Sequence, residues 1–294
     1  MSLNCDDSQV MIPEASDSNS FGITYTALDN NILGDDRILK QLLQIEDNYV
    51  PKGVLESYKC IQSEVEPNMR KIVSNWMLEV CEETNCEEVV FPVAMNFLDR
   101  FLVSTDIRKS QLQLVGVVCL LIASKLRQCQ TLEPHVLSYF TDYSVTVEEI
   151  IAWELLILRR IQWDVSSVVA TDYLDHLFIR LPTIVSNNNN TDNTSSHNCY
   201  DSIIRRHSST FIALCTTELQ FSCLTPSLIA AASIATAVHG LESTNNNNND
   251  KQNKTFETTV QSLSKILDID SSRIRVCVDQ IESLVATRAA DYRH

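Results

Sequence analysis

The run from Leu112 to Ala123 is the part of the sequence that most restricts the fold. Its letters, LQLVGVVCLLIA, are apolar almost throughout, yet the run is shorter than the roughly 20 residues that a membrane-spanning helix needs. A helix that is apolar on every side belongs at the centre of a helical bundle. Gly116 within the run has no side chain, so we expect a neighbouring helix to approach closely there. The sequence therefore predicts a buried central helix over residues 110–127.

The scarcity of turn-forming residues favours an all-α fold. The chain of 294 residues contains only 5 glycines and 7 prolines, which leaves little material for turn-rich β architecture. A chain of this length usually forms one or two domains. A second apolar run, opened by Thr225-Pro226 and closed by Gly240, mirrors the first one. We therefore expect two tandem five-helix bundles, over residues 36–165 and 170–290.

Local signals mark several helices around the central one. The apolar residues of MRKIVSNWMLEV, residues 69–80, recur at spacings of three and four, which is typical of one helix face. Asn68 precedes this pattern as the expected N-cap. Pro92 fits only into the first turn of a helix that starts near Val90. Thr146 followed by Glu149 is a capping-box signature for a further helix.

Some segments are expected to remain outside the bundles. Residues 1–35 contain several acidic residues and no lysine or arginine, a pattern typical of a solvated, disordered tail. Two asparagine-rich tracts, residues 187–198 and 245–253, cannot bury apolar surface and are predicted to be disordered loops. Each doubling of loop length costs only about 0.6 kcal/mol, so the second bundle can carry such insertions.

Charge and cysteine usage exclude several classes of protein. The formal net charge of -15 opposes binding to nucleic acid, and the basic pairs Arg159-Arg160 and Arg205-Arg206 are isolated. We therefore expect no nucleic-acid partner, and no membrane partner because no run spans a bilayer. The ten cysteines form no C-x-x-C pair, and the N-terminus has no secretion signal, which indicates a reducing compartment.

Motifs for catalysis are absent from the sequence. It contains no glycine-rich phosphate loop, no H-E-x-x-H and no G-x-S-x-G, and its six histidines do not pair at metal-ligand spacing. We therefore expect no catalytic residue, no metal site and no cofactor. A non-enzymatic role is the prediction from the residues alone.

Several segments, in matching order, resemble a cyclin, and their amino-acid sequences are most similar to those of a D-type cyclin. These segments are MRKIV (69–73), WMLEVCEE (76–83), VFPVAMNFLDRFL (90–102), LQLVG (112–116), ASK (123–125) and IIRRHSSTFIALC (203–215). The resemblance implies two tandem cyclin boxes that bind and activate a cyclin-dependent kinase of the 4/6 class. It further implies phosphorylation of retinoblastoma-type proteins, entry into DNA synthesis, kinase-inhibitor proteins as additional partners, and a location in nucleus and cytoplasm.

The resemblance also implies roles for two charged pairs. Lys125 and Glu154 match the lysine and glutamate with which cyclins grip the kinase backbone beside its C helix. Without the resemblance each would be read as a solvated helix charge. Arg70 and Asp99 match a structural salt bridge that braces the first two helices of the box. No acidic residue follows within 126–129, where the D-type pattern has one, so the preferred kinase is left open.

Two docking elements complete the predicted sites. Periodicity alone would assign the stripe on residues 69–80 to the core, whereas the resemblance makes part of it a groove for R-x-L motifs, in which Glu79 meets the arginine. The predicted groove residues are Met69, Ile72, Val73, Trp76, Glu79, Leu112 and Gln113. Near the N-terminus, Leu3, Cys5 and Asp7 approximate the L-x-C-x-E motif that binds pocket proteins. Asp7 stands where the motif has glutamate, so its side chain is one methylene shorter.

Two other functions are compatible with the same pattern. A cyclin-like scaffold would bind a kinase without activating it, and the sequence leaves that alternative open. The core of transcription factor IIB also resembles a tandem pair of cyclin boxes. A DNA-binding core needs lysine and arginine along one face, so the acidity of this chain disfavours the second alternative.

Overall fold

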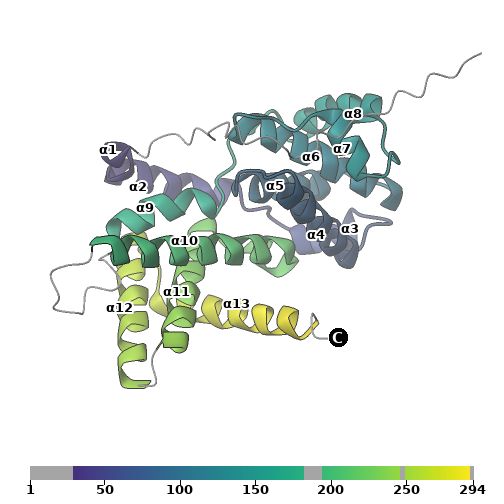
Figure 1. Ribbon diagram of the computed structural model, residues 1–294. Coiled ribbons are helices and arrows are strands. Elements are labelled where there is room, and N and C mark those ends of the chain that lie inside the picture. Colours follow the sequence, from purple (N-terminus) through teal and green to yellow (C-terminus); the bar gives the residue numbers. More distant parts are fainter. Residues whose placement is uncertain (1–28, 182–193, 246–248, 292–294) are drawn as a thin grey trace, which may run out of the picture.

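The computed structural model describes residues 29–181, 194–245 and 249–291, which form helices and no strand. The helices gather into two bundles, the first made of α4–α8 and the second of α9–α13 (Figure 1). The elements are α1 (Asn30–Leu33), α2 (Asp36–Ile45), η1 (Glu46–Asn48), α3 (Val54–Cys60), α4 (Pro67–Glu83), α5 (Val90–Ser104), η2 (Lys109–Gln111), α6 (Leu112–Arg127), α7 (Pro134–Phe140), α8 (Val147–Arg160), α9 (Thr171–Arg180), α10 (Thr194–Thr217), η3 (Leu219–Cys223), α11 (Pro226–Asn245), α12 (Asn249–Leu267) and α13 (Ser271–Asp291). The predicted all-α fold of two tandem five-helix bundles is confirmed.

Helix α6 is the centre of the first bundle, as its apolar sequence predicts. It packs against α4, α5 and α8, and its residues 112 and 114–124 are buried. A Cβ atom at Gly116 would lie 3.1 Å from both Met77 Sδ and Val73 Cγ1, which confirms the close approach of α4. By length and composition alone, Lys109–Arg127 would qualify as a membrane span in the described part of the chain, but 67% of its apolar window is buried among the other helices.

Helix α11 has the same central place in the second bundle. Its small side chains, among them the buried alanines 230–232, let α9, α10, α12 and α13 pack around it. The prediction that Gly240 closes this helix is wrong, because α11 continues to Asn245. A glycine inside a helix costs only about 1 kcal/mol relative to alanine, so it does not by itself end the helix.

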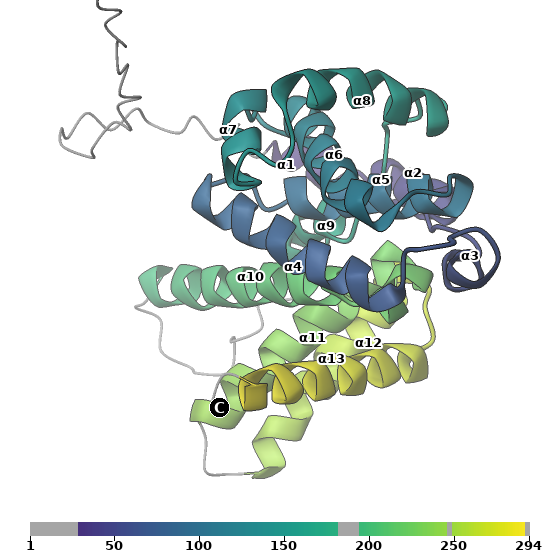
Figure 2. The same ribbon diagram turned by 90° about the vertical axis from the view of Figure 1, so that its right-hand side faces the viewer.

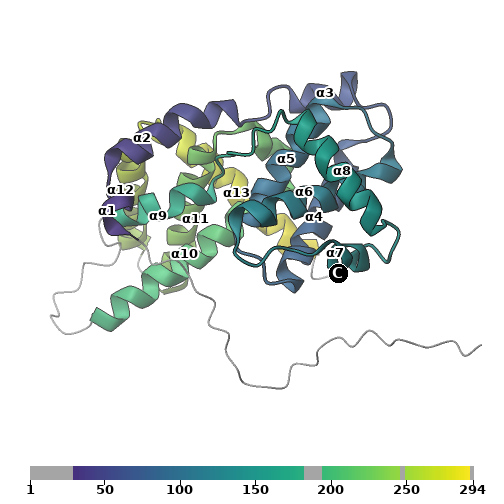
Figure 3. The ribbon, with the colours of Figure 1, turned by 90° about the horizontal axis from the view of Figure 1, so that it is seen from above.

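The helices that precede the first bundle pack on the second one. Leu39 of α2 is buried in the core of the second bundle, and the Leu33 carbonyl at the end of α1 accepts a hydrogen bond of 2.6 Å from Arg180. Figure 1 and Figure 3 show α1 and α2 beside α9. Residues 30–33, which the sequence assigns to the tail over 1–35, are helical, while residues 1–28 lie outside the described residues. Helix α2 packs on the second bundle and not on the one predicted over 36–165. A four-residue helix has no periodic pattern, and amphipathicity does not say which bundle a helix joins.

Glu46 fastens this N-terminal segment to the second bundle. Its buried carboxylate accepts hydrogen bonds from the Tyr173 hydroxyl (2.9 Å) and from the Ser227 backbone N–H (2.8 Å) and hydroxyl (2.7 Å). Ser227 lies in the first turn of α11, whose free N–H groups favour an acceptor with negative charge. One carboxylate therefore ties η1 to both α9 and α11.

The ends of several helices differ from the sequence prediction. Helix α10 includes Asn198 and α12 includes residues 249–253, so these parts of the asparagine-rich tracts are helical and not loops. Residues 182–193 and 246–248 lie outside the described residues. Extending a helix that packing has already nucleated adds one hydrogen bond per residue, which lets poor helix formers join its end.

Two helix starts test the capping predictions. Helix α4 starts at Pro67 with Glu66 as its N-cap, so Asn68 lies inside the first turn, because proline fits well at the first helical position. The Thr146–Glu149 capping box is confirmed. The Thr146 hydroxyl accepts from the Glu149 backbone N–H at 3.2 Å, and Glu149 Oε2 accepts from the Thr146 backbone N–H at 2.9 Å.

Candidate functional site

Lys125 and Glu154 lie opposite each other at the surface of the first bundle. Lys125 Nζ on α6 is 2.6 Å from Glu154 Oε1 on α8, and their side chains are 45% and 21% exposed. Lys125 lies in the last turn of α6, where the helix dipole favours a cation. The structure thus brings together the two residues that the sequence predicts to bind the kinase, on the exposed end of an otherwise buried helix.

Exposed apolar side chains neighbour this ion pair along α6 and α8. Ile151 and Leu155 of α8 are exposed, and their spacing of four residues places them on the same helix face, beside Glu154. Leu126 is exposed next to Lys125. Apolar side chains grouped at the surface around a charged pair indicate a protein-binding surface. Sequence reasoning missed these three residues, although α8 is apolar on more than one face, which is a signal for such a surface.

The stripe on α4 forms a groove with the start of α6, and most of the predicted residues line it. Those residues are Met69, Ile72, Val73, Trp76, Leu112 and Gln113. Ile72 is 60% exposed, whereas Met69, Val73 and Trp76 are half-buried against the core of the first bundle. Glu79 does not line the groove but lies exposed two turns after Ile72 on the same face of α4. Lys109 of η2 lines the groove and was missed, because the predicted helix starts after it.

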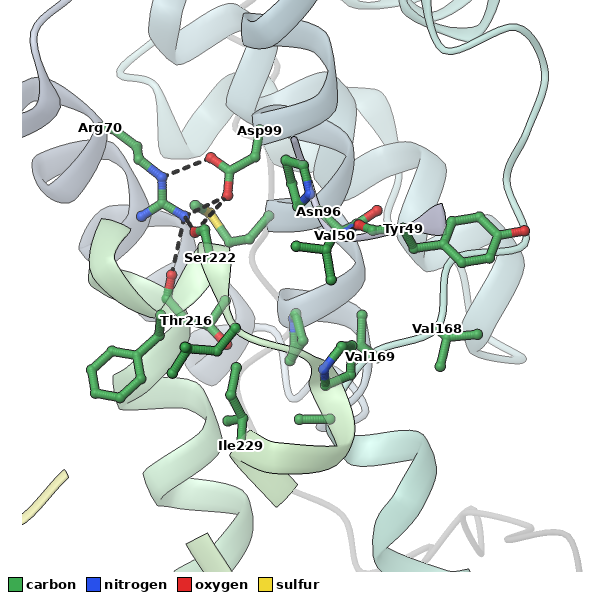
Figure 4. A pocket seen from close by; sticks show the side chains of 17 residues that line it. Tyr49, Val50, Arg70, Asn96, Asp99, Val168, Val169, Thr216, Ser222 and Ile229 are labelled. Carbon is green, nitrogen blue, oxygen red and sulfur yellow. Dashed lines mark hydrogen bonds and ion pairs between the residues drawn. The ribbon is translucent and has the colours of Figure 1, made fainter. Parts of the chain in front are cut away.

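Arg70 and Asp99 form a buried ion pair between α4 and α5. Arg70 Nε is 2.7 Å from Asp99 Oδ1 and its second guanidinium N–H group is 2.7 Å from Oδ2, with side chains that are 1% and 4% exposed. Figure 4 shows the two side chains facing each other. Burial opposes the charge of the guanidinium, but the adjacent Asp99 carboxylate outweighs it, so the pKa of Arg70 is raised. The pairing that the sequence predicts is present.

The same guanidinium also reaches the second bundle. It donates to the carbonyl oxygens of Thr217 (3.0 Å) and Thr216 (3.3 Å) and to the Ser222 hydroxyl (3.0 Å). The carbonyls belong to the last turn of α10, where helix carbonyls lack helical partners. The ion pair therefore connects four elements, α4 and α5 of the first bundle with α10 and η3, whereas the sequence predicts a brace within the first bundle only.

Further polar contacts reinforce this contact between the bundles. Helix α10 runs beneath α4, with α13 on its far side (Figure 2). Lys71 Nζ is 2.7 Å from Glu218 Oε1, and Arg288 of α13 donates to the side chains of Asn75 and Thr217, both at 2.9 Å. The end of α10 is thus held by charged groups from α4 and from α13. These contacts fix the orientation of the two bundles.

A pocket lies beside the ion pair, between the bundles (Figure 4). Its lining is mostly apolar, with Val50, Val169 and Ile229 among the residues that face it. The Asn96 side chain donates to the Tyr49 carbonyl at 2.7 Å and accepts from the Ser167 hydroxyl at 2.9 Å. Because the amide already has partners on both sides, we interpret the pocket as a gap between packed helices.

The other predicted elements give no further site. Leu3, Cys5 and Asp7 lie outside the described residues, so the pocket-protein motif stays a prediction. Within residues 29–181, 194–245 and 249–291, no three His, Cys, Asp or Glu side chains are placed to hold a metal ion.

Comparison with known proteins matches this architecture. The family description "Cyclin, N-terminal domain" matches residues 37–166, and "Cyclin, C-terminal domain" matches residues 177–293. The chain is similar to G1/S-specific cyclin-D1 of Xenopus laevis, with 41% identity over 269 residues, which cover 91% of this chain and 86% of the relative. It is also similar to G1/S-specific cyclin-D2 of Mus musculus, with 38% identity over 265 residues, 90% of this chain and 85% of the relative.

A solved structure shares the fold. The X-ray structure of a viral cyclin from herpesvirus saimiri aligns with a TM-score of 0.61 at 27% identity and covers 82% of this chain and 97% of that chain. Both family descriptions, the identity to the relatives and the shared fold agree with the two bundles described above. The chain therefore belongs to the cyclin family, within it to the D-type cyclins, and is a regulatory subunit of a cyclin-dependent kinase.

Proposed function

We propose that the chain activates a kinase of the cyclin-dependent 4/6 class and binds it through the surface formed by Leu126, Lys125, Ile151, Glu154 and Leu155. The observation that carries this proposal is the Lys125–Glu154 ion pair amid exposed apolar side chains. The names of the relatives, G1/S-specific cyclins, support a role at entry into DNA synthesis. The substrates of the complex are then retinoblastoma-type proteins.

The chemistry of this surface suits a partner helix. Burying the apolar side chains against the kinase supplies most of the binding free energy. Lys125 and Glu154 exchange their mutual contact for polar groups of the kinase backbone, and such charged contacts fix the register of the two proteins. The kinase C helix is thereby held inward, so that the lysine–glutamate pair needed for phosphoryl transfer forms in the kinase. The cyclin supplies binding and no catalytic group.

Phosphorylation of a retinoblastoma fragment by a 4/6-class kinase tests this proposal. The variant Lys125→Ala with Glu154→Ala is expected to lower the activity at least tenfold, because truncating charged groups at a desolvated interface weakens binding by about 2 to 5 kcal/mol. The matched control is Arg275→Ala with Glu257→Ala, a half-exposed ion pair on the second bundle. Equal activity of the two double variants would contradict the proposed face. Kinase binding without activity in the wild type would indicate a scaffold instead.

The groove between α4 and α6 is proposed to hold R-x-L motifs of substrates and of kinase-inhibitor proteins. Ile72, which is 60% exposed, offers the apolar contact, and Glu79 on the same helix face offers a carboxylate for the arginine. Ile72→Asp is expected to slow phosphorylation of substrates that carry the motif and to spare short peptides without it. Val276→Asp on α13, where the side chain is 57% exposed, is the control for an added surface charge. Equal loss with both substrates would contradict docking in this groove.

A further inference from the structure

The C-terminal end of α4 brings two cysteines together. The Cys86 backbone N–H donates to the Cys81 carbonyl at 2.9 Å, and the Asn85 N–H donates to the Glu82 carbonyl at 3.2 Å. Asn85 between them has a φ of 50°, in the left-handed region that asparagine tolerates. These features define a Schellman motif, in which the side chains at the positions of Cys81 and Cys86 come into contact. The helix ending itself therefore places the two thiols side by side.

The two thiols have different surroundings. Cys81 is 6% exposed in the core of the first bundle, whereas Cys86 is half-buried. Cys86 Sγ lies 3.3 Å from the Thr84 hydroxyl. A hydrogen bond from the Cys81 thiol lowers the pKa of Cys86 to about 6 against the effect of burial, and Thr84 and Gln128 add smaller contributions. The hydrogen bond to Cys86, together with burial, raises the pKa of Cys81. Cys86 is thus the nucleophile and Cys81 the protonated neighbour.

We propose that Cys81 and Cys86 form a dithiol that hydrogen peroxide oxidises to an intramolecular disulfide. The Cys86 thiolate attacks one peroxide oxygen, so that an S–O bond forms, the O–O bond breaks and hydroxide leaves. The hydroxide becomes water by taking up the proton that the Cys86 thiol released on ionising. The Cys81 sulfur then attacks the sulfenic acid sulfur of Cys86; the S–S bond forms, the S–O bond breaks, and the leaving oxygen departs as water with the Cys81 proton. Two thiols are oxidised and one peroxide is reduced to two water molecules.

The charges around the motif favour a small neutral oxidant. Glu82 and Glu83 precede the turn, and Glu87 and Glu88 follow it directly. These carboxylates repel anionic reagents such as glutathione disulfide, whereas they do not repel hydrogen peroxide. Since Cys81 is buried, the sulfur that it can reach is that of Cys86. The site is therefore expected to form the internal disulfide in preference to a mixed disulfide with glutathione.

Oxidation of the dithiol would change the hydrogen bonds at the C-terminal end of α6. Gln128, the C-cap residue of α6, accepts from the Glu87 backbone N–H at 3.2 Å, donates to the Gln130 carbonyl at 2.5 Å and contacts Cys86. A disulfide removes the Cys86 sulfur as an acceptor for Gln128, three residues after Lys125. This consequence rests on the proposed kinase-binding face. The loss of about one hydrogen bond predicts that kinase binding weakens about two- to tenfold.

Peptide mass mapping tests the dithiol directly. Trypsin cleaves after Lys71 and Arg100, so residues 72–100 form one peptide that carries both cysteines and no other. After treatment of the full chain with hydrogen peroxide, this peptide is expected to become lighter by two hydrogen atoms under non-reducing conditions. Cys60→Ser and Cys129→Ser, at exposed cysteines outside the pair, are expected to preserve this change. Absence of the mass loss in the wild type would overturn the proposal.

A variant and a second oxidant define the roles of the two thiols. Cys81→Ser, which keeps a small hydrogen-bond donor beside Cys86 but cannot form a disulfide, is expected to leave Cys86 as a sulfenic acid that dimedone labels. Dimedone labelling of Cys60 and Cys129 ahead of Cys86 would overturn the assignment of Cys86 as nucleophile. Glutathione disulfide is expected to form the disulfide more slowly than peroxide at equal concentration, and an equal rate would overturn the role of the carboxylates.

Kinase binding before and after oxidation tests the coupling to α6 separately. The oxidised chain is expected to bind a 4/6-class kinase about two- to tenfold more weakly than the same chain reduced with dithiothreitol. A disulfide that forms without any change in binding would overturn the coupling and leave the dithiol standing. Absence of kinase binding by the reduced chain would refute the proposed kinase, whereas the mass mapping would still decide the dithiol.

Discussion

Removing the Arg70 guanidinium is expected to destabilise both bundles strongly. In the variant Arg70→Ala, the Ser222 hydroxyl (2.9 Å) is the one side-chain donor that Asp99 keeps among the described residues, and the Thr216 and Thr217 carbonyls lose a charged donor. The side chains of the pair are 1% and 4% exposed, so water does not replace the lost contacts. Breaking a buried ion pair by removing one partner costs about 3 to 5 kcal/mol. We expect the free energy of unfolding to fall by that amount.

A second variant separates the stranded charge from the lost packing. Replacing both partners, as Arg70→Met with Asp99→Leu, leaves no charge buried alone, and apolar replacements of buried ion pairs are often nearly neutral. The double variant is therefore expected to lose less stability than the sum of the two single variants Arg70→Met and Asp99→Leu. The difference, a coupling free energy of about 1 to 3 kcal/mol, is typical of residues in one hydrogen-bond network.

Urea unfolding followed by two probes measures these effects. The three tryptophans, at positions 76, 153 and 163, all lie in or directly after helices of the first bundle, so their fluorescence follows that bundle, while circular dichroism follows all helices. Because Arg70 joins the bundles, the two transitions are expected to separate in Arg70→Ala. Arg275→Ala, at a half-exposed pair, is the control with an expected loss below about 1 kcal/mol. An equally small loss for Arg70→Ala, or additive single variants, would refute the reasoning.

Three smaller perturbations test other parts of the structure. Gly116→Ala is expected to be less stable than Gly240→Ala by about 1 to 3 kcal/mol in thermal unfolding, because a Cβ atom meets α4 at Gly116 and open space at Gly240. Thr146→Ala removes the capping box of α8 and is expected to cost about 0.5 to 2 kcal/mol in urea unfolding, with Thr287→Ala, on the exposed face of α13, as the control. Burial raises the pKa of Glu46 above its ordinary value, although its hydrogen bonds from Ser227 and Tyr173 oppose the shift. The contribution of Glu46 to the free energy of unfolding is therefore fully present below the ordinary pKa. It is lost as the pH rises through the raised pKa of the folded protein. In unfolding curves from pH 4 to pH 7, Glu46→Gln is expected to gain stability relative to the wild type as pH rises, and a parallel pH dependence would contradict the raised pKa.

Periodicity and composition predict the elements of this fold better than their assembly. The apolar run at 112–123 predicts the central helix because such a surface has to be covered on all sides. Helix α2 shows the limit, since its amphipathic pattern demands a partner without saying that Leu39 packs into the second bundle. The resemblance predicts that Arg70 meets Asp99, but the further partners of Arg70 include backbone carbonyls, which have no side-chain signature in a sequence.

In the candidate sites, too, the sequence predicts some residues, while others depend on how the chain is assembled. The groove on α4 is predicted by the resemblance. Lys109, which also lines the groove, lies in a turn of 3-10 helix that the α-helical periodicity does not predict. The contact between Cys81 and Cys86 depends on Asn85 adopting a left-handed conformation. That conformation ends the helix and turns the chain back, and a search for C-x-x-C spacing cannot detect it.

The attachment of Glu46 to Ser227 sets the order in which the chain can fold on the ribosome. The two residues are separated by 181 positions, and at about 5 to 20 residues per second the ribosome takes roughly 10 to 40 s to synthesise that interval. The first bundle is complete in sequence before α11 has emerged, so it can fold while α2 still lacks its partner. The amphipathic N-terminal helix is then a late-docking segment, available during synthesis to chaperones that bind exposed apolar surface.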